Sequence, residues 1–447
     1  MLLACVVGLI ASAAAAEKPV SFQGDVSPVL RRSCVGCHRP GKLKGKLDLS
    51  SVEMIMKGGK SGPAVVAGQP RKSLLIQQVS GPKPMMPEEG DPLTSPEVAL
   101  ISKWVRQGAR EDKTESRASS RPAGPIVYRS SPAIPAIAFS PDGKMLAVAG
   151  THEVILRDGD GSNVIARLVG DAPRIESLAF SPDGTVLAAA GGAASEFGEV
   201  QVWDMTTLRS AGAFKAGRDT LYGVAFSPDG RWLALGGAEK AVRVLSSDDG
   251  KERFRFDQHS DWVFGVAFNT NGSRLATASR DRLMKWIDSA QGAFIDDLNK
   301  PYEGLLCLAR HPTEDLLAHG TDTGAVRVYR MNENTALKDP DKDPRYVREF
   351  DRLPGPVHAV AFSADGNLIA VGGAGPEARV YRSKDGGRVA TLKGHAGPIY
   401  TVAFRPQGGQ VVTAGQDGQL RFYDLPSGLL RATISGVPVW GAQSARP

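Results

Sequence analysis

The chain has 447 residues, of which 42% are hydrophobic and 23% charged, as in globular proteins of two or three domains. Its 51 glycines and 30 prolines favour a turn-rich, β-heavy architecture over a helical one. The modest net charge of +6 argues against nucleic-acid binding, and after the N-terminus no apolar stretch approaches the roughly 18 residues of a membrane span.

The N-terminus is an apolar run, LLACVVGLIASAAAA, that ends in small residues before Glu17. This pattern is typical of a secretory signal peptide, so we predict cleavage after Ala16 and a periplasmic or secreted mature protein. Because the usual basic start is missing, an N-terminal membrane anchor or buried helix remains an alternative. In a lipoprotein signal the cysteine lies at the end of the apolar run. Cys5 lies near the start of this run, so lipidation is not expected.

Residues 33 to 39 read SCVGCHR. The pattern C-x-x-C-H is the signature of c-type haem attachment, in which Cys34 and Cys37 would form thioether bonds and His38 would be the proximal iron ligand. A disulfide or another metal site stays open. However, a structural zinc site usually has a second Cys/His pair, and a redox dithiol has a βαβ context. Neither is visible near the motif.

Two helices are predicted at the ends of this region. The first leads into the motif and has apolar residues at helical spacing: Phe22, Val26, Val29 and Leu30. The second is predicted to start with Ser95 as N-cap, followed by Pro96, and to end at Gly108; its apolar stripe is Val98, Ile101, Trp104 and Val105. Two such helices resemble those with which small class I cytochromes c cover their haem.

No second histidine lies in this region, so the soft donors for a second axial ligand are its methionines, Met54, Met56, Met85 and Met86. The stretches KGGKSGPAVVAGQPRKSLLIQQVSG and KPMMPEEGDPLTSPEVALISKWVRQGA resemble the cytochrome domain of planctomycete-type multidomain proteins, and the resemblance covers residues 20–110. It implies one haem c, a Gly-rich loop close to it, and Met86 as distal ligand, with Met85 as the alternative.

Most of the net charge lies in the same region, since residues 17–112 contain fifteen Lys and Arg but only ten Asp and Glu. Basic residues surround the motif without an acidic residue between them: Arg31, Arg32, Arg39, Lys42, Lys44 and Lys46. They would steer an acidic redox partner to the haem edge, although a merely solvated basic face explains them equally well.

Residues 113–125, KTESRASSRPAGP, read as an exposed linker.

A repeat fills the remainder of the chain. Seven segments similar to IPAIAFSPDGKMLAVAG recur with gaps of 41, 46, 42, 42, 52 and 42 residues, anchored at Phe139, Phe180, Phe226, Phe268, Arg310, Phe362 and Phe404. This period is that of four-stranded propeller blades. Each unit has an apolar strand, a turn such as Pro-Asp-Gly, a second strand and a third strand with endings such as VWD, KWID, VYR and FYD.

The repeat resembles the WD40 family over residues 126–440. In that family a Gly-His pair, a turn Asp and an aromatic residue form a buried network. The matching residues are Gly394, His395, Asp417 and Tyr423 in one blade, and in part Gln258, His259, Asp281 and Trp286 in another. Two segments compete for the edge at which the ring closes, PIVYRS (residues 125–130) and LLRATISG (residues 429–436), so the closing strand is left open.

No catalytic set is recognisable in the propeller. Its histidines are scattered over different blades, so structural or surface roles are expected: His152, His259, His311, His319, His358 and His395. Cys307 is predicted to be a buried, inert thiol. The charged insertion of residues 331–353 would be an exposed loop that binds a partner or is inert.

We therefore predict a signal peptide (1–16), an all-α cytochrome c haem domain (17–112), a linker (113–125) and an all-β, seven-bladed WD40 propeller (126–447). The leading hypothesis is electron transfer through the haem, with the propeller docking a protein partner. The alternative is an oxidoreductase whose propeller binds a substrate or second cofactor and passes electrons to the haem; a third hypothesis is a haem sensor with the propeller as scaffold. The sequence does not decide whether the protein is an enzyme.

Overall fold

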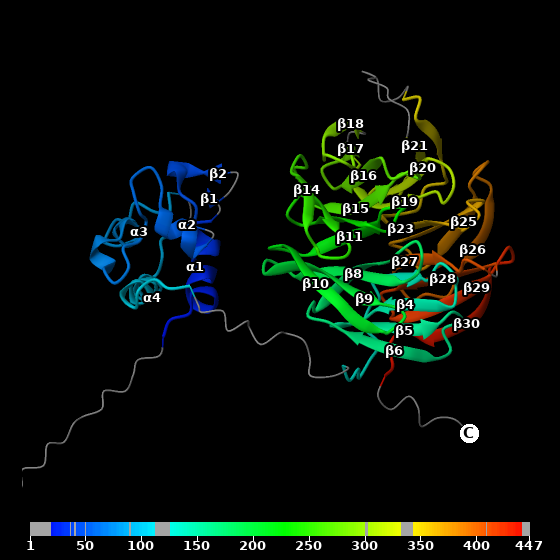
Figure 1. Cartoon of the computed structure of the whole chain (residues 1–447), viewed down its shortest axis with the longest axis horizontal. Coiled ribbons are helices and arrows are strands. Elements are labelled where there is room, and N and C mark those ends of the chain that lie inside the picture. Colours follow the sequence, from blue (N-terminus) through cyan, green and yellow to red (C-terminus); the bar gives the residue numbers. More distant parts are fainter. Residues whose placement is uncertain are drawn as a thin grey trace, which may run out of the picture. The chain divides into compact units, whose positions relative to one another are not determined.

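The computed structural model of the chain describes residues 19–35, 37–39, 42–49, 51–88, 91–111, 126–299, 303–331, 343–407 and 409–439 (Figure 1). The chain divides into two compact units, residues 1–118 and residues 119–447. The predicted signal peptide and linker fall outside the described residues, as do residues 332–342 of the predicted insertion. The expectation of an exposed loop is wrong for the rest of the insertion, because residues 346–349 form strand β22 and Phe350 and Leu353 are buried. Among the helices that are described, none combines the length and apolar character needed to cross a bilayer.

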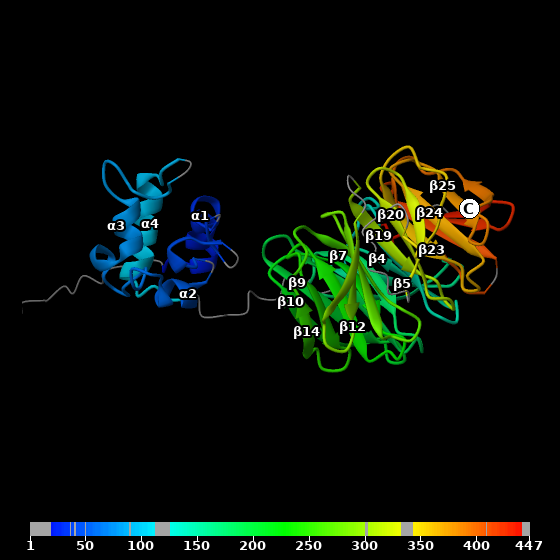
Figure 2. The ribbon, with the colours of Figure 1, turned by 90° about the horizontal axis from the view of Figure 1, so that it is seen from above.

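The first unit is helical, with one two-stranded hairpin. Its elements are η1 (Phe22–Val26), α1 (Ser27–Ser33), β1 (His38–Arg39), β2 (Lys42–Leu43), η2 (Lys44–Lys46), α2 (Val52–Lys57), η3 (Pro70–Lys72), α3 (Leu74–Val79) and α4 (Ser95–Arg106). Figure 2 shows α3 beside α4, and the two helices are in contact. The predicted all-α fold class is confirmed in its main features.

The two predicted helices meet in the core of this unit. Phe22 of the π-helical turn η1 lies against Trp104 of α4, with ring centroids 5.2 Å apart, and both side chains are buried. The predicted N-cap of the second helix is wrong by one residue. Thr94 is the N-cap, because its backbone N–H and its hydroxyl both donate to the Glu97 carboxylate, at 2.9 and 2.8 Å, in a capping box.

The second unit is a propeller of seven four-stranded antiparallel sheets, as predicted. Blade 1 contains β3 (Ile137–Phe139), β4 (Met145–Ala149), β5 (Glu153–Asp158) and β6 (Val164–Val169). Blade 2 contains β7 (Arg174–Phe180), β8 (Val186–Ala193), β9 (Phe197–Asp204) and β10 (Arg209–Gly217). Blade 3 contains β11 (Leu221–Phe226), β12 (Trp232–Gly237), β13 (Val242–Ser246) and β14 (Glu252–Phe256). Blade 4 contains β15 (Val263–Phe268), β16 (Arg274–Ser279), β17 (Leu283–Asp288) and β18 (Phe294–Asn299).

The remaining three blades follow in chain order. Blade 5 contains β19 (Leu305–Arg310), β20 (Leu316–Thr321), β21 (Val326–Arg330) and β22 (Tyr346–Glu349). Blade 6 contains β23 (Val357–Phe362), β24 (Leu368–Gly373), β25 (Ala378–Arg382) and β26 (Arg388–Leu392). Blade 7 contains β27 (Ile399–Phe404), β28 (Gln410–Gly415), β29 (Gln419–Asp424) and β30 (Leu429–Ser435). The first strand of each blade contacts the first strand of the next, and β27 contacts β3, so the inner strands form a closed circle.

Residues 429–435 form β30, the outer strand of blade 7, so this segment occupies the edge at which the ring closes. In the part of the chain that the structure describes, the competing segment, residues 125–130, forms no strand and makes one backbone bridge, between Tyr128 and Val439. Arg157 of β5 reinforces the closure: its guanidinium is nearly buried and donates to the carbonyls of Ser435, at 2.8 Å, and Gly436, at 3.4 Å.

Two blades contain the predicted histidine networks. His395 contacts Asp417 and Thr413, and Tyr423 donates from its hydroxyl to the Lys393 carbonyl at 2.9 Å. His259 makes the equivalent contacts to Asp281 and Thr277, each at 2.8 Å. These bonds satisfy the buried imidazoles, which supports their predicted structural role.

The assignment of Trp286 to the aromatic position was wrong by one residue. Trp286 pairs with Ala276 across the sheet, whereas Tyr423 pairs with Val411, so Ile287 is the residue of blade 4 that corresponds to Tyr423. A shift of one residue turns a side chain to the other face of a sheet. Trp286 therefore packs under the Arg345 guanidinium, 4.5 Å from the ring centroid, instead of joining the histidine network.

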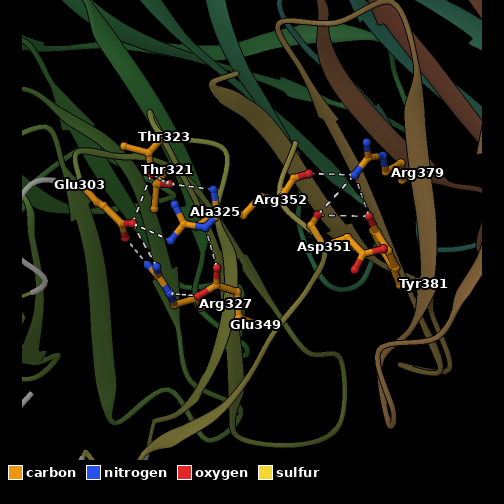
Figure 3. A network of polar contacts seen from close by, with 10 residues as sticks. All are labelled: Glu303, Thr321, Thr323, Ala325, Arg327, Glu349, Asp351, Arg352, Arg379 and Tyr381. Atoms are coloured by element: carbon orange, nitrogen blue, oxygen red, sulfur yellow. Dashed lines mark hydrogen bonds and ion pairs between the residues drawn. The ribbon is translucent and has the colours of Figure 1, made fainter. Parts of the chain in front are cut away.

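Blade 5 contains an arginine–glutamate network instead (Figure 3). Arg327 of β21 is nearly buried and donates to Glu303 and, at 2.7 Å, to Glu349 of β22. Arg352 donates to Glu303 at 3.1 Å. Burial raises the pKa of Glu303, but the hydrogen bonds and charges of the two arginines outweigh burial and lower the pKa to about 2. The ionised Glu303 thus joins the segment before β19 to the outer part of the blade.

Candidate functional site

The C-x-x-C-H motif lies at the C-terminal end of α1. The Cys34 N–H donates to the Leu30 carbonyl at 2.8 Å, and the Cys34 carbonyl accepts from the N–H groups of Cys37 and His38, both at 3.1 Å. These bonds make a tight turn directly after the helix. The sequence therefore continues α1 into a turn that presents both thiols and the imidazole to one region.

The His38 ring is oriented by a backbone carbonyl. Its Nδ1 lies 3.0 Å from the Lys44 oxygen. Because a carbonyl oxygen only accepts, Nδ1 carries the hydrogen, and Nε2 of the neutral ring has the lone pair that a metal needs. This is the arrangement expected of an iron-ligating histidine, although the ligand role itself remains a prediction.

Met86 is held by the end of α3. The N–H groups of Met85 and Met86 both donate to the Gln78 carbonyl, at 2.9 and 3.0 Å. Met86 is partly buried and packs against the core of the unit, whereas 67% of Met85 is exposed. This difference in burial favours Met86 over Met85 as a ligand that must face an interior site.

Cys34, Cys37, His38 and Met86 line one cavity of about 490 Å³. This volume lies in the range of about 300–1,000 Å³ that is usual for small-molecule and cofactor sites. Much of the remaining wall is apolar, with Leu47, Leu49, Ala64, Leu74, Leu75 and Val79. Among the described residues, the other methionines of this unit, Met54, Met56 and Met85, do not line it. The donor set and the apolar wall fit a haem.

The Gly-rich loop lies at this cavity, as the resemblance implied. Gly59 and Gly62 line it. A Cβ added at Gly59 would come within 2.6 Å of the Gly45 oxygen, and the same oxygen accepts from the Lys60 N–H at 2.7 Å. Glycine is therefore required at position 59, because the loop passes too close to η2 for a side chain.

Two ion pairs involve residues of the cavity wall. Arg32 of α1 donates to Glu97 of α4 at 2.5 Å, and Lys44 of η2 donates to Glu88 at 3.0 Å. Hydrogen bonding to the Thr94 backbone and to Arg32 lowers the pKa of Glu97 to about 2. These contacts tie α1 to α4 and η2 to the segment after Met86.

The structure also provides evidence on the two alternatives to haem, a disulfide-forming cysteine pair and another metal site. Burial raises the pKa of the Cys34 thiol to about 11, against the smaller opposing effect of Arg32. A redox dithiol uses a cysteine whose pKa is lowered, so Cys34 does not have that character. Across the part of the chain that the structure describes, no three His, Cys, Asp or Glu side chains are grouped so as to hold a metal ion.

Structural roles were predicted for three propeller residues, Cys307, His311 and His319, whose surroundings the structure describes. Burial raises the pKa of Cys307 to about 12, which agrees with the predicted inert thiol. Burial also lowers the pKa of His319 to about 3, so this histidine is neutral at physiological pH. His311 contacts the Gly366 carbonyl from Nε2 at 3.1 Å. These environments agree with structural rather than catalytic roles.

Sequence reasoning missed two residues that position the site, Lys44 and Gln78. Both act on the predicted ligands through backbone carbonyls. Every residue has such a carbonyl, so no side-chain pattern could have indicated them. The Lys44–Glu88 pair was also missed, since 44 residues separate the partners in the chain.

Comparisons with known families agree with this description. Residues 34–90 match the family model described as Planctomycete cytochrome C, and this range includes all four predicted haem-binding residues. Residues 162–204 and 209–246 match the model of the WD domain, G-beta repeat, and residues 262–439 match that of the Nucleolar protein 10-like, N-terminal domain. No curated protein matches the chain. The protein thus combines a planctomycete-type cytochrome c region with a seven-bladed WD40-type propeller.

Proposed function

We propose that this protein transfers electrons through one haem c, bound covalently by Cys34 and Cys37. The observation that carries the proposal is the convergence of these cysteines, His38 and Met86 on one cavity of about 490 Å³. When bound, the haem would supply one-electron chemistry at its iron. The match of residues 34–90 to a cytochrome family supports the same cofactor.

The four predicted haem-binding residues have different roles in holding the haem. Cys34 and Cys37 anchor it, and His38 offers Nε2 because the Lys44 carbonyl holds Nδ1–H at 3.0 Å. Met86 offers a soft thioether sulfur from a loop fixed to α3. With Met86 as a ligand in addition to His38, the haem would have a raised reduction potential, which would favour electron transfer over ligand binding or substrate chemistry.

An acidic redox protein is the partner that we propose for this site. Leu43 and Met85 are exposed, by 49% and 67%, and each is next in the chain to a residue that lines the cavity, Lys44 and Met86. Lys60 also lines it. Exposed apolar and basic residues at a cavity suit a transient, electrostatically steered complex. The propeller would serve as a scaffold that docks a protein partner, and the apolar N-terminus of the sequence supports export to the periplasm or beyond.

The test is to produce the protein in a host that attaches c-type haem and to record its spectra. We expect haem that stays on the chain under denaturing conditions and a ferric form with the weak red absorption of a Met–iron bond. Met86→Ala should abolish that band and lower the potential. Met85→Ala is the matched control and should change neither. A five-coordinate, high-spin wild-type protein would rule out the role of Met86.

A further inference from the structure

One residue, Lys44, contacts both the segment that contains His38 and the segment that follows Met86. Its backbone N–H donates to the Cys37 carbonyl at 3.1 Å, and its carbonyl accepts from His38 Nδ1 at 3.0 Å. Its ammonium group donates to Glu88 Oε2 at 3.0 Å, two residues after Met86. Lys44 and Glu88 both line the cavity. Lys44 therefore links the segment that orients His38 to the segment that contains Met86.

We propose that the Lys44–Glu88 ion pair is a latch that keeps the Met86 loop, residues 85–88, closed over the cavity. This inference rests on the proposed function, in which Met86 is the distal ligand. The start of the loop is fixed by the Met85 and Met86 N–H groups on the Gln78 carbonyl. The pair with Lys44 fixes its other end at Glu88. A segment held at both ends keeps Met86 in the cavity wall, which it lines.

The latch is a weak one, as its exposure shows. The side chains of Lys44 and Glu88 are 44% and 57% exposed, so water and salt screen their attraction. Loss of the pair should therefore loosen the loop without unfolding the unit. Opening of the loop releases Met86 and lets an external ligand compete for its place. Lys44 and Glu88 thus act as positioning residues through Met86.

The chain provides a matched control. Arg32 also lines the cavity and also forms an ion pair, at 2.5 Å to Glu97. That pair joins α1 to α4 and does not involve residues 85–88. Arg32→Gln consequently removes a positive charge from the cavity wall while leaving the proposed latch intact.

The experiment is a titration of the ferric, haem-loaded full-length protein with imidazole, which displaces a methionine ligand. Lys44→Gln and Glu88→Gln should each raise the affinity for imidazole about two- to fivefold, the range expected for loss of an exposed ion pair. The double variant should show no more than the effect of either single variant. The exchanged pair, Lys44→Glu with Glu88→Lys, should return toward wild-type affinity, and Arg32→Gln should change the imidazole affinity less than either single variant.

The reduction potential separates a latch from a simple effect of charge. Loss of a cation lowers the potential and loss of an anion raises it, so the two single variants should shift it in opposite directions. A latch instead makes both variants bind imidazole more tightly, and about 1 M salt should remove the difference from wild type. Imidazole affinities that change in opposite directions, or that equal those of Arg32→Gln, would overturn the latch. A wild-type protein without the Met–iron band would overturn the proposed ligation and the latch together, so the two failures are distinguishable.

Discussion

The two units differ in what occupies their centres. In the propeller, apolar side chains of neighbouring blades pack directly on one another, and the buried histidines His259 and His395 have partners of their own. In the first unit, residues of α1, η2, α3 and the connecting loops line a cavity of about 490 Å³ beside the apolar core. A packed interior supports itself, whereas a cavity of this size forgoes the contacts that a filled core would make. We therefore expect the propeller to be stable alone and the first unit to depend on its cofactor.

The strongest test of this contrast is removal of the haem anchors. Cys34→Ala with Cys37→Ala should abolish covalent haem attachment, which a haem stain on a denaturing gel measures. A ligand that binds only the folded state adds stability, so its loss should make the first unit sensitive to limited proteolysis while the propeller stays intact. Cys307→Ala is the control and should keep the haem. A resistant haem-free first unit would show that the cavity does not weaken the fold.

A second test removes one buried tryptophan from each unit. Trp104 is 1% exposed, packs on Phe22 and donates its indole N–H to the Arg110 carbonyl at 2.9 Å. Trp104→Ala should lower the free energy of unfolding of the first unit by about 3–5 kcal/mol. Trp203→Ala, at a residue 2% exposed in blade 2, should affect only the propeller. Calorimetry should show two transitions, of which each variant moves one; coupled shifts would contradict independent units.

A third test concerns the closure of the ring. Arg157→Met keeps much of the apolar stem but leaves the carbonyls of Gly161 and Ser435 without the donor that each has at 2.8 Å. Loss of such charged hydrogen bonds should cost about 2–3 kcal/mol of the unfolding free energy of the propeller. The first unit should be unaffected. Denaturant unfolding followed by tryptophan fluorescence measures this, and an unchanged midpoint would show that apolar packing alone closes the ring.

The smallest expected effect is a pH dependence. The pKa of Glu97 falls from 4.5 to about 2 because of the Thr94 backbone N–H and the Arg32 guanidinium. A lowered pKa in the folded state means that this contribution to stability is present above about pH 4.5 and is lost as the pH falls toward about 2. Glu97→Gln should flatten the acid dependence of the first transition in calorimetry. The propeller transition should keep its own acid dependence, to which Glu303 contributes. If Glu97→Gln leaves the acid dependence of the first transition unchanged, the assignment of this dependence to Glu97 is wrong.

Local signals in the sequence were reliable where the chain repeats a short pattern. The spacing of the anchors predicted seven blades, because each blade is one self-contained sheet that recurs along the chain. The apolar periodicity predicted the first and last helices of the first unit, and the structure shows that they meet in the Phe22–Trp104 contact. Errors arose at single-residue precision: Thr94 replaced Ser95 as N-cap, and Trp286 was out of register by one residue. Both depend on hydrogen-bond partners that a pattern of residue types does not specify.

The sequence by itself determined the modular plan of this protein and indicated the chemistry that we propose for its site, because C-x-x-C-H and the blade repeat are contiguous in the chain. The tertiary structure decided which parts of the chain meet. Met86, and not Met85, lines the cavity with His38. Strand β30 forms the edge of blade 7 for which two segments were predicted, and Lys44 forms an ion pair with Glu88. Such choices depend on burial and on backbone groups that every residue shares, so only the folded chain could make them.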